Sequence, residues 1–103
     1  MAPSPKFHQV VQEMLALHDR KNNDYGADAD PFANFRAAET WGVPAWKHVY
    51  LRIEEKLQRL RQFSLKGELA NESADDSVLD IAVLAAIAVV LFREANEKVD
   101  ADA

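Results

Sequence analysis

The chain has 103 residues, of which 49% are hydrophobic and 28% charged, and its formal net charge at pH 7 is −5. The apolar fraction excludes a disordered chain, and the acidic balance argues against a nucleic-acid polymer as partner, because such binders normally carry a basic surplus. There is no cysteine, which excludes disulfides, thiolate metal sites and cysteine nucleophiles. One domain, residues 1–103, is expected, and the scarcity of glycine and proline favours an all-α fold.

A first helix is predicted to begin at Ser4 and Pro5, because serine is a good N-cap and proline suits a first turn. Apolar side chains at helical spacing continue it to about Lys21; they are Phe7, Val10, Val11, Met14 and Leu15. The residues before it, 1–4, are expected to be frayed. They contain no apolar signal segment, so the protein is expected in the cytoplasm.

The polar stretch 21–30 is predicted to be a loop. Asn and Asp favour turns, so a plain surface loop explains it, but loops on a rigid scaffold also carry binding residues. As a binding loop, it would offer Lys21 to a phosphate and Tyr25 to a base, and Asp24 would bind an amide or a metal ion.

A short second helix is predicted to begin with Asp30 as N-cap and Pro31 in its first turn. Phe32 and Phe35 share one face and are expected in the core, while Asn34 lies on another side. The sequence WGVP at 41–44 ends this helix.

A long third helix is predicted from about Pro44 to Lys66, with Gly67 as its C-terminal cap. Its apolar stripe comprises Trp46, Val49, Tyr50, Ile53, Leu57 and Leu60. A basic ridge of Arg52, Lys56 and Arg59 flanks the stripe, and Glu55 lies within pairing distance of either arginine. The ridge is either a solvated face with ion pairs or a surface that meets the next helix.

The fourth helix is predicted from about Ala74 to Glu97, with Ser73 as N-cap and a frayed tail at 98–103. Its apolar run 81–92 is too short to span a bilayer and therefore predicts a core helix. Asp76 and Asp80 fall on the same stripe as Leu84, Ile87 and Leu91. Burying a carboxylate costs several kcal/mol unless it is paired, so these aspartates predict a metal ion or a basic partner.

The opposite side of the fourth helix carries small residues, namely Ala82, Ala85, Ala86 and Val89. Because both sides require burial, a homo-oligomer (a dimer or tetramer) is expected to form through this helix. The short connection after Lys66 predicts that the third and fourth helices are antiparallel neighbours.

Four segments together resemble the all-α nucleoside triphosphate pyrophosphohydrolases, the MazG-like and dimeric dUTPase-like proteins. They are KNNDYG at 21–26, FANF at 32–35, RIEEKLQRL at 52–60 and ESADDSVLD at 72–80. The nearest branch is the nucleotide modification associated domain 1, often found in phages. This resemblance implies an antiparallel bundle of about four helices, completed by oligomerisation, and a host-cell cytoplasmic location if a phage encodes it.

The resemblance also implies a reaction in which Mg²⁺, or Mn²⁺, bridges the phosphates of a (deoxy)nucleoside triphosphate or a modified nucleotide. Metal-activated water would attack the α-phosphorus and release pyrophosphate. The implied metal ligands are Glu55, Glu72, Asp76 and Asp80, with Glu55 and Glu72 catalytic. The implied substrate-binding residues are Lys21, Asp24, Tyr25, Arg52, Lys56 and Arg59.

One departure from the family pattern keeps other functions open. The third helix of these enzymes usually carries Glu-x-x-Glu, but here Leu57 follows Glu54 at that spacing and Gln58 follows Glu55. The alternatives are a nucleotide-binding or sequestering module without turnover, and a structural helical protein whose acids are paired to Arg52, Lys56 and Arg59.

Overall fold

The fold is described from a computed structural model, which covers residues 2–25, 30–68 and 73–102, with the side chains of 22–25 and 99–102 outside the description. The elements in chain order are α1 (Pro5–Tyr25), α2 (Ala33–Arg36), the 3-10 helix η1 (Ala37–Trp41), α3 (Ala45–Lys66) and α4 (Ala74–Asp102). The predicted all-α class is confirmed.

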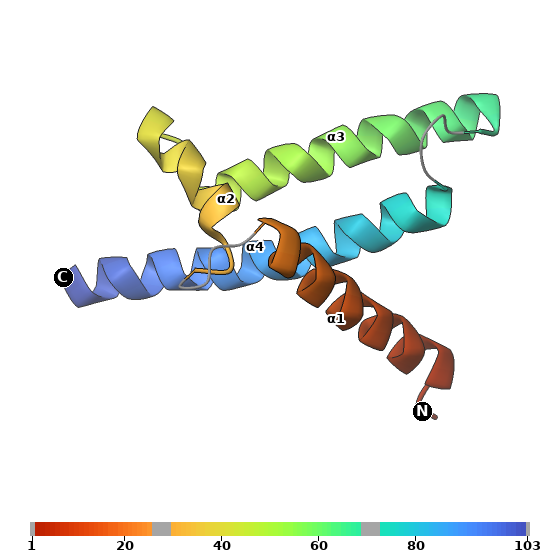
Figure 1. Cartoon of the computed structure of the whole chain (residues 1–103), viewed down its shortest axis with the longest axis horizontal. Helices are drawn as coiled ribbons and strands as arrows, with labels where there is room; N and C mark the ends of the chain where they lie inside the picture. The colour runs from red at the N-terminus through yellow and green to blue at the C-terminus, as the bar shows by residue number, and fades with distance from the viewer. Residues whose placement is uncertain (1, 26–29, 69–72, 103) are drawn as a thin grey trace.

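The helices α3 and α4 lie side by side and antiparallel, as the short connection between them predicts (Figure 1). Val49 of α3 is fully buried between them, and α4 contributes most of the remaining core. The buried apolar residues are Phe35, Ala45, Val49, Val83, Ile87, Ala88 and Leu91. The run 81–92 is therefore a core helix. No helix in the described part of the chain is both long and apolar enough to cross a membrane.

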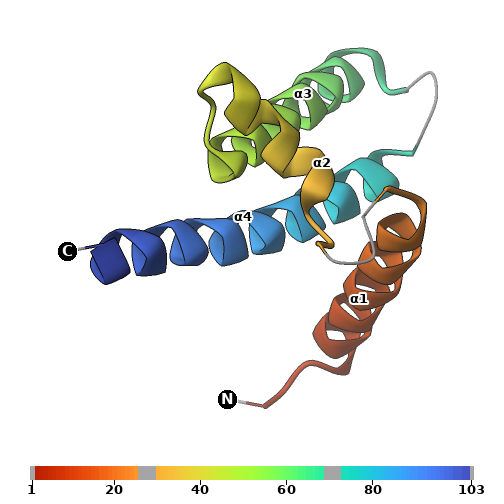
Figure 2. The same cartoon turned by 60° about the vertical axis from the view of Figure 1, so that its left-hand side comes forward.

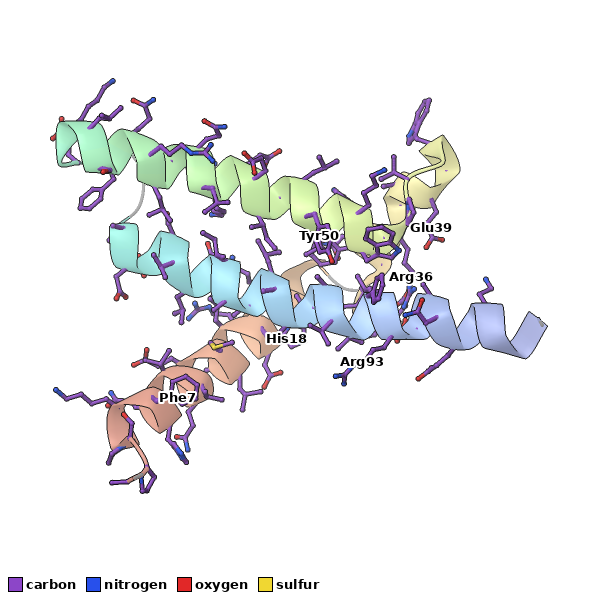
Figure 3. The ribbon with its side chains drawn as sticks, turned by 180° about the vertical axis from the view of Figure 1, so that it is seen from behind. Phe7, His18, Arg36, Glu39, Tyr50 and Arg93 are labelled. Carbon is purple, nitrogen blue, oxygen red and sulfur yellow. The ribbon has the colours of Figure 1, made fainter. Side chains whose placement is uncertain are left out.

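Among the described residues, helix α1 packs on the core from about Met14 onward. Met14 and Leu17 contact the core, whereas Phe7 and Leu15 are 65% and 59% exposed. Figures 1 and 2 both show the N-terminal half of α1 running away from α4, and Figure 3 shows Phe7 on this projecting half. The apolar stripe predicted for α1 is present, but within the described part of the chain Phe7, Val10 and Leu15 stay exposed.

The predicted helix caps at three positions are confirmed. Ser4 Oγ accepts a hydrogen bond from the Phe7 N–H at 3.2 Å, and Ser73 Oγ accepts one from the Asp76 N–H at 3.0 Å. Gly67 ends α3 with a φ of 79°, a left-handed conformation that glycine adopts without strain, and its N–H bonds the Phe63 carbonyl.

The ends of three predicted elements were wrong. Helix α1 continues past Lys21 to Tyr25, so the first half of the expected loop is helical, and α4 continues past Glu97 to Asp102, through much of the expected frayed tail. Neither extension contains proline or glycine to stop it. The second helix begins at Ala33, because the Asp30 carboxylate accepts from the Phe32 N–H in a preceding turn.

Substituting Ser73→Ala is expected to destabilise the protein by about 1 kcal/mol, because it removes the cap of a helix that carries most of the core. Ser4→Ala is the matched control. It removes the same kind of bond from the projecting half of α1, whose fraying leaves the core intact. Urea unfolding followed by circular dichroism measures both. Equal losses would contradict this account of α1.

Candidate functional site

Three helices meet at one ion cluster, the Asp80 triad, which comprises Lys21 of α1, Lys56 of α3 and Asp80 of α4. Lys21 Nζ lies 2.9 Å from Asp80 Oδ1, and Lys56 Nζ lies 2.9 Å from Asp80 Oδ2. Asp80 is buried, and the Lys56 side chain is 15% exposed. Each carboxylate oxygen thus accepts from an ammonium group, which offsets the cost of burying the charge.

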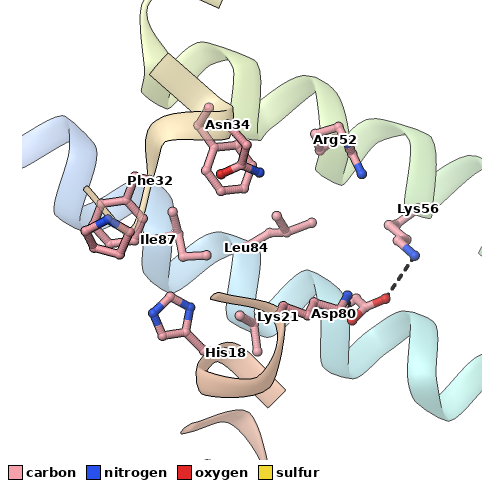
Figure 4. Close-up of a pocket in the computed structure, with 12 residues that line it drawn as sticks. His18, Lys21, Phe32, Asn34, Arg52, Lys56, Asp80, Leu84 and Ile87 are labelled. Atoms are coloured by element: carbon pink, nitrogen blue, oxygen red, sulfur yellow. Dashed lines mark hydrogen bonds and ion pairs between the residues drawn. The ribbon is translucent and has the colours of Figure 1, made fainter. Parts of the chain in front are cut away.

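The triad follows from the helix patterns. Asp80 lies on the buried stripe of α4, Lys56 flanks the apolar stripe of α3, and Lys21 lies where α1 crosses α4 (Figure 4). Burial alone would raise the pKa of Asp80, but the hydrogen bonds from Lys21 and Lys56 outweigh it and hold that pKa below its usual value. Asp80 is therefore a carboxylate at neutral pH.

The triad forms one end of a cavity of about 130 Å³ between α1, α2, α3 and α4 (Figure 4). Arg52 joins Lys21 and Lys56 at this end, so the described residues bring three cations here beside Asp80. The described residues that line the cavity are His18, Lys21, Pro31, Phe32, Asn34, Phe35, Arg52, Lys56, Asp80, Val83, Leu84 and Ile87.

The other end of the cavity is aromatic. The rings of His18 and Phe32 are stacked, with centroids 6.0 Å apart and planes 30° apart. Asn34 extends from α2 toward the same space and brings an amide donor and acceptor (Figure 4). An aromatic face next to an amide is suited to a planar heterocycle.

Helix α2, which together with the preceding Phe32 brings Asn34 to the cavity, is held against α4 by Arg36. Its guanidinium bonds Asp30 at 2.6 Å and Glu94 of α4 at 2.8 Å. The hydrogen bond from the Phe32 N–H is the main cause that lowers the pKa of Asp30, and Arg36 lowers it further. The hydrogen bond to Glu94 is the main cause that raises the pKa of Arg36. This clamp fixes the aromatic end of the cavity relative to the triad.

The acids implied as metal ligands are dispersed where the structure describes them. Glu55 is 67% exposed and pairs with Arg52 at 3.6 Å, and Asp76 is exposed in the first turn of α4. Glu72 lies outside the described residues. Within the described ranges no group of three or more Asp, Glu or His side chains could hold a metal ion. Both Asp80 oxygens are bonded to lysines, so a metal ion would compete with Lys21 and Lys56 for this carboxylate.

The predicted substrate-binding residues divide into two groups. Lys21, Arg52 and Lys56 line the cavity, whereas Arg59 is exposed on α3 and does not line it. Asp24 and Tyr25 belong to the last turn of α1, and their side chains lie outside the description. Trp46, from the apolar stripe of α3, packs on the core as predicted and meets Phe92 edge to face.

Sequence reasoning missed His18 and Asn34 as cavity residues and treated Phe32 as core alone. The available signal was the polar Asn34 beside two phenylalanines, of which Phe35 is buried and Phe32 partly buried. No family model, curated protein or solved structure matches this chain, so these contacts are the basis for assigning its function.

Proposed function

We propose that the protein binds a nucleotide, with its phosphates at the Asp80 triad and Arg52, and its base at the aromatic end of the cavity. One observation carries this proposal: cations, aromatic rings and an amide from four helices line a single cavity. Arginine and lysine are the usual partners of phosphate, and stacked rings are the usual partners of a base.

The charge balance of the site supports an anionic ligand. Arg52 is half exposed, and the partner described for it is the exposed Glu55, at 3.6 Å. An exposed ion pair of this length contributes little to stability, so the guanidinium can turn to a phosphate at little cost. Among the described residues, Lys21, Arg52 and Lys56 bring three cations to the end of the cavity that Asp80 lines. A neutral ligand would gain nothing from this arrangement.

The cavity volume limits what is enclosed. About 130 Å³ is below the roughly 300 Å³ at which pockets for whole small molecules begin, so only part of a nucleotide fits inside. We place the base edge inside, against Phe32 and Asn34, and the phosphates at the open, charged mouth.

Magnesium- or manganese-dependent hydrolysis to a nucleoside monophosphate and pyrophosphate is a second proposal. It is supported by the resemblance to the MazG-like enzymes and by the position of Asp80 at the phosphate end. Asp80 would hold the metal ion, which would supply an activated water, and Lys21 and Lys56 would bind the phosphates. A homo-oligomer acting in the cytoplasm, a host cytoplasm for a phage protein, completes this proposal.

A panel of nucleotides with and without Mg²⁺ or Mn²⁺, followed by thermal shift and pyrophosphate release, tests both proposals. At ten times its dissociation constant, a bound nucleotide should stabilise the protein by about 1.4 kcal/mol, a shift of several degrees in Tm. Stabilisation with intact nucleotide supports binding alone, and metal-dependent pyrophosphate release supports hydrolysis. A flat response in both assays would leave the triad as a purely structural ion cluster.

A further inference from the structure

The side chain of His48, on α3, holds the backbone of α2. His48 Nδ1 lies 3.2 Å from the carbonyl oxygen of Phe35. Because a carbonyl oxygen only accepts hydrogen bonds, Nδ1 carries the proton and donates, as it does in an imidazolium or in a neutral ring protonated at Nδ1. His48 is half-buried, so water is partly excluded from the bond. The bond therefore joins α2 to α3 directly, past the intervening helix η1.

The ring of Phe35 makes a second contact with the same histidine. The two rings meet edge to face, with centroids 5.8 Å apart and planes 71° apart. Phe35 is itself part of the buried core. His48 thus contacts both the backbone and the side chain of one residue, which defines the orientation of α2 at that point.

Helix α2 needs such contacts because it is only four residues long, Ala33–Arg36. Isolated helices shorter than about 12 residues are marginal in water. Its N-cap residue, Phe32, makes no side-chain capping bond. Arg36 attaches α2 to α4 through a solvent-accessible ion pair, and His48 attaches it to α3. The two attachments lead to different helices, so neither replaces the other.

The aromatic end of the cavity depends on where Phe35 lies. Asn34 directly precedes it, and the Phe35 N–H bonds the Phe32 carbonyl at 3.0 Å. A shift of Phe35 therefore moves the two residues that α2 and its N-cap bring to the cavity (Figure 4). Binding groups must be held within about 0.5 Å of their productive positions, so a small shift is enough to weaken a contact.

One face of α3 serves both ends of the cavity. His48, Arg52 and Lys56 follow one another at intervals of four residues, so their side chains lie on the same side of the helix. Arg52 and Lys56 line the cationic end directly. His48 is not among the residues that line the cavity, and it acts through α2, which carries none of the three cations.

We infer that His48 is a positioning residue for base recognition: by holding the Phe35 carbonyl, it fixes Asn34 and Phe32 where a nucleobase meets them. This inference rests on the proposed function. It adds that the base and the phosphates are held by separately supported parts of the site, so that affinity for one can be lost without affinity for the other.

Calorimetric titration of a nucleoside triphosphate and of inorganic tripolyphosphate, which has no base, tests the inference. His48→Leu removes the donor and should weaken nucleoside triphosphate binding by about tenfold, the equivalent of one lost hydrogen bond. Tripolyphosphate affinity should change by less than about twofold, because the cations belong to α1 and α3. Equal losses for the two ligands, or no loss for either, would overturn the inference.

Two further substitutions show whether the hydrogen bond itself is responsible. His48→Asn keeps an N–H donor at the same number of bonds from the backbone as Nδ1, so it should recover most of the affinity. His48→Gln moves the donor one bond further and should resemble His48→Leu, which it replaces if the leucine variant does not fold. An asparagine variant as weak as these two would overturn the inference. His8→Leu, at an exposed position of α1, is the matched control and should bind both ligands like the native protein.

Amide hydrogen exchange measures the attachment of α2 without any ligand. In His48→Leu, the amides of residues 33–38 should exchange about tenfold faster than in the native protein, while those of 83–91 in α4 keep their native rates. Unchanged exchange in α2 would overturn the inference. If the native protein binds neither ligand, the proposed function fails and base recognition with it, whereas faster exchange in α2 would still establish that His48 positions this helix.

Discussion

Asp80→Asn should lower the free energy of unfolding by about 2–3 kcal/mol, because it removes the shared anion of two lysines at a junction of three helices. The single oxygen of an asparagine amide can accept a hydrogen bond from one of the two lysines. Its NH₂ group is a donor, so it cannot accept a hydrogen bond from the other lysine. Lys56, 15% exposed, then stays largely buried without this carboxylate. The half-exposed Lys21 can turn to water, which keeps the loss below that of a fully buried pair.

Urea unfolding of the native protein and the variant measures this loss. Glu97→Gln is the matched control, because it removes the same charge from an exposed position of α4 and should change stability by less than about 0.5 kcal/mol. Equal effects of the two substitutions would mean that the triad contributes nothing beyond net charge.

The contribution of the Asp80 triad should also depend on pH. The folded pKa of Asp80 lies below its unfolded value, so near pH 4 the unfolded state binds more protons at this residue. Stability from the triad is complete above about pH 5 and is lost as the pH falls through the folded pKa. The difference in unfolding free energy between the native protein and Asp80→Asn should therefore shrink between pH 6 and pH 3. A constant difference would contradict the assignment.

The sequence predicted the helices because their apolar spacing and caps are local properties. Ser4, Ser73 and Gly67 mark helix ends, and the stripe through Leu84, Ile87 and Leu91 marks the buried face of α4. Helix ends without such a marker were placed too early. Nothing in the residues after Lys21 or Glu97 stops a helix, and polarity alone does not do so.

The candidate site was predictable only in part. Asp80 requires a partner, and the basic ridge of α3 offers Lys56. Lys21 falls at the predicted boundary between helix and loop, whereas α1 continues to Tyr25 and holds Lys21 against Asp80. Which side chain of α1 reaches Asp80 depends on the angle at which α1 crosses α4. That angle comes from packing between distant segments and has no local pattern. The same applies to His18, which pairs with Phe32 only across this junction.

Arg52→Gln should weaken nucleotide binding by about 10- to 100-fold, because it removes a charge-assisted bond to phosphate at the mouth of the cavity. Stability should change by less than about 0.5 kcal/mol, because its ion pair with the exposed Glu55 is long and solvated. The substitution therefore separates ligand binding from folding, which Asp80→Asn cannot do.

Arg61→Gln is the matched control for this last substitution. Arg61 is also on α3, is similarly exposed and has a similar ion pair, at 3.4 Å to Glu54, but it does not line the cavity. Calorimetric titration of a nucleoside triphosphate should show a loss of affinity for Arg52→Gln alone. Equal losses would indicate attraction by overall charge, and no loss in either would remove the phosphate from the mouth of the cavity. Because the two variants have the same net charge, a selective effect of Arg52 can arise only from its position beside the Asp80 triad.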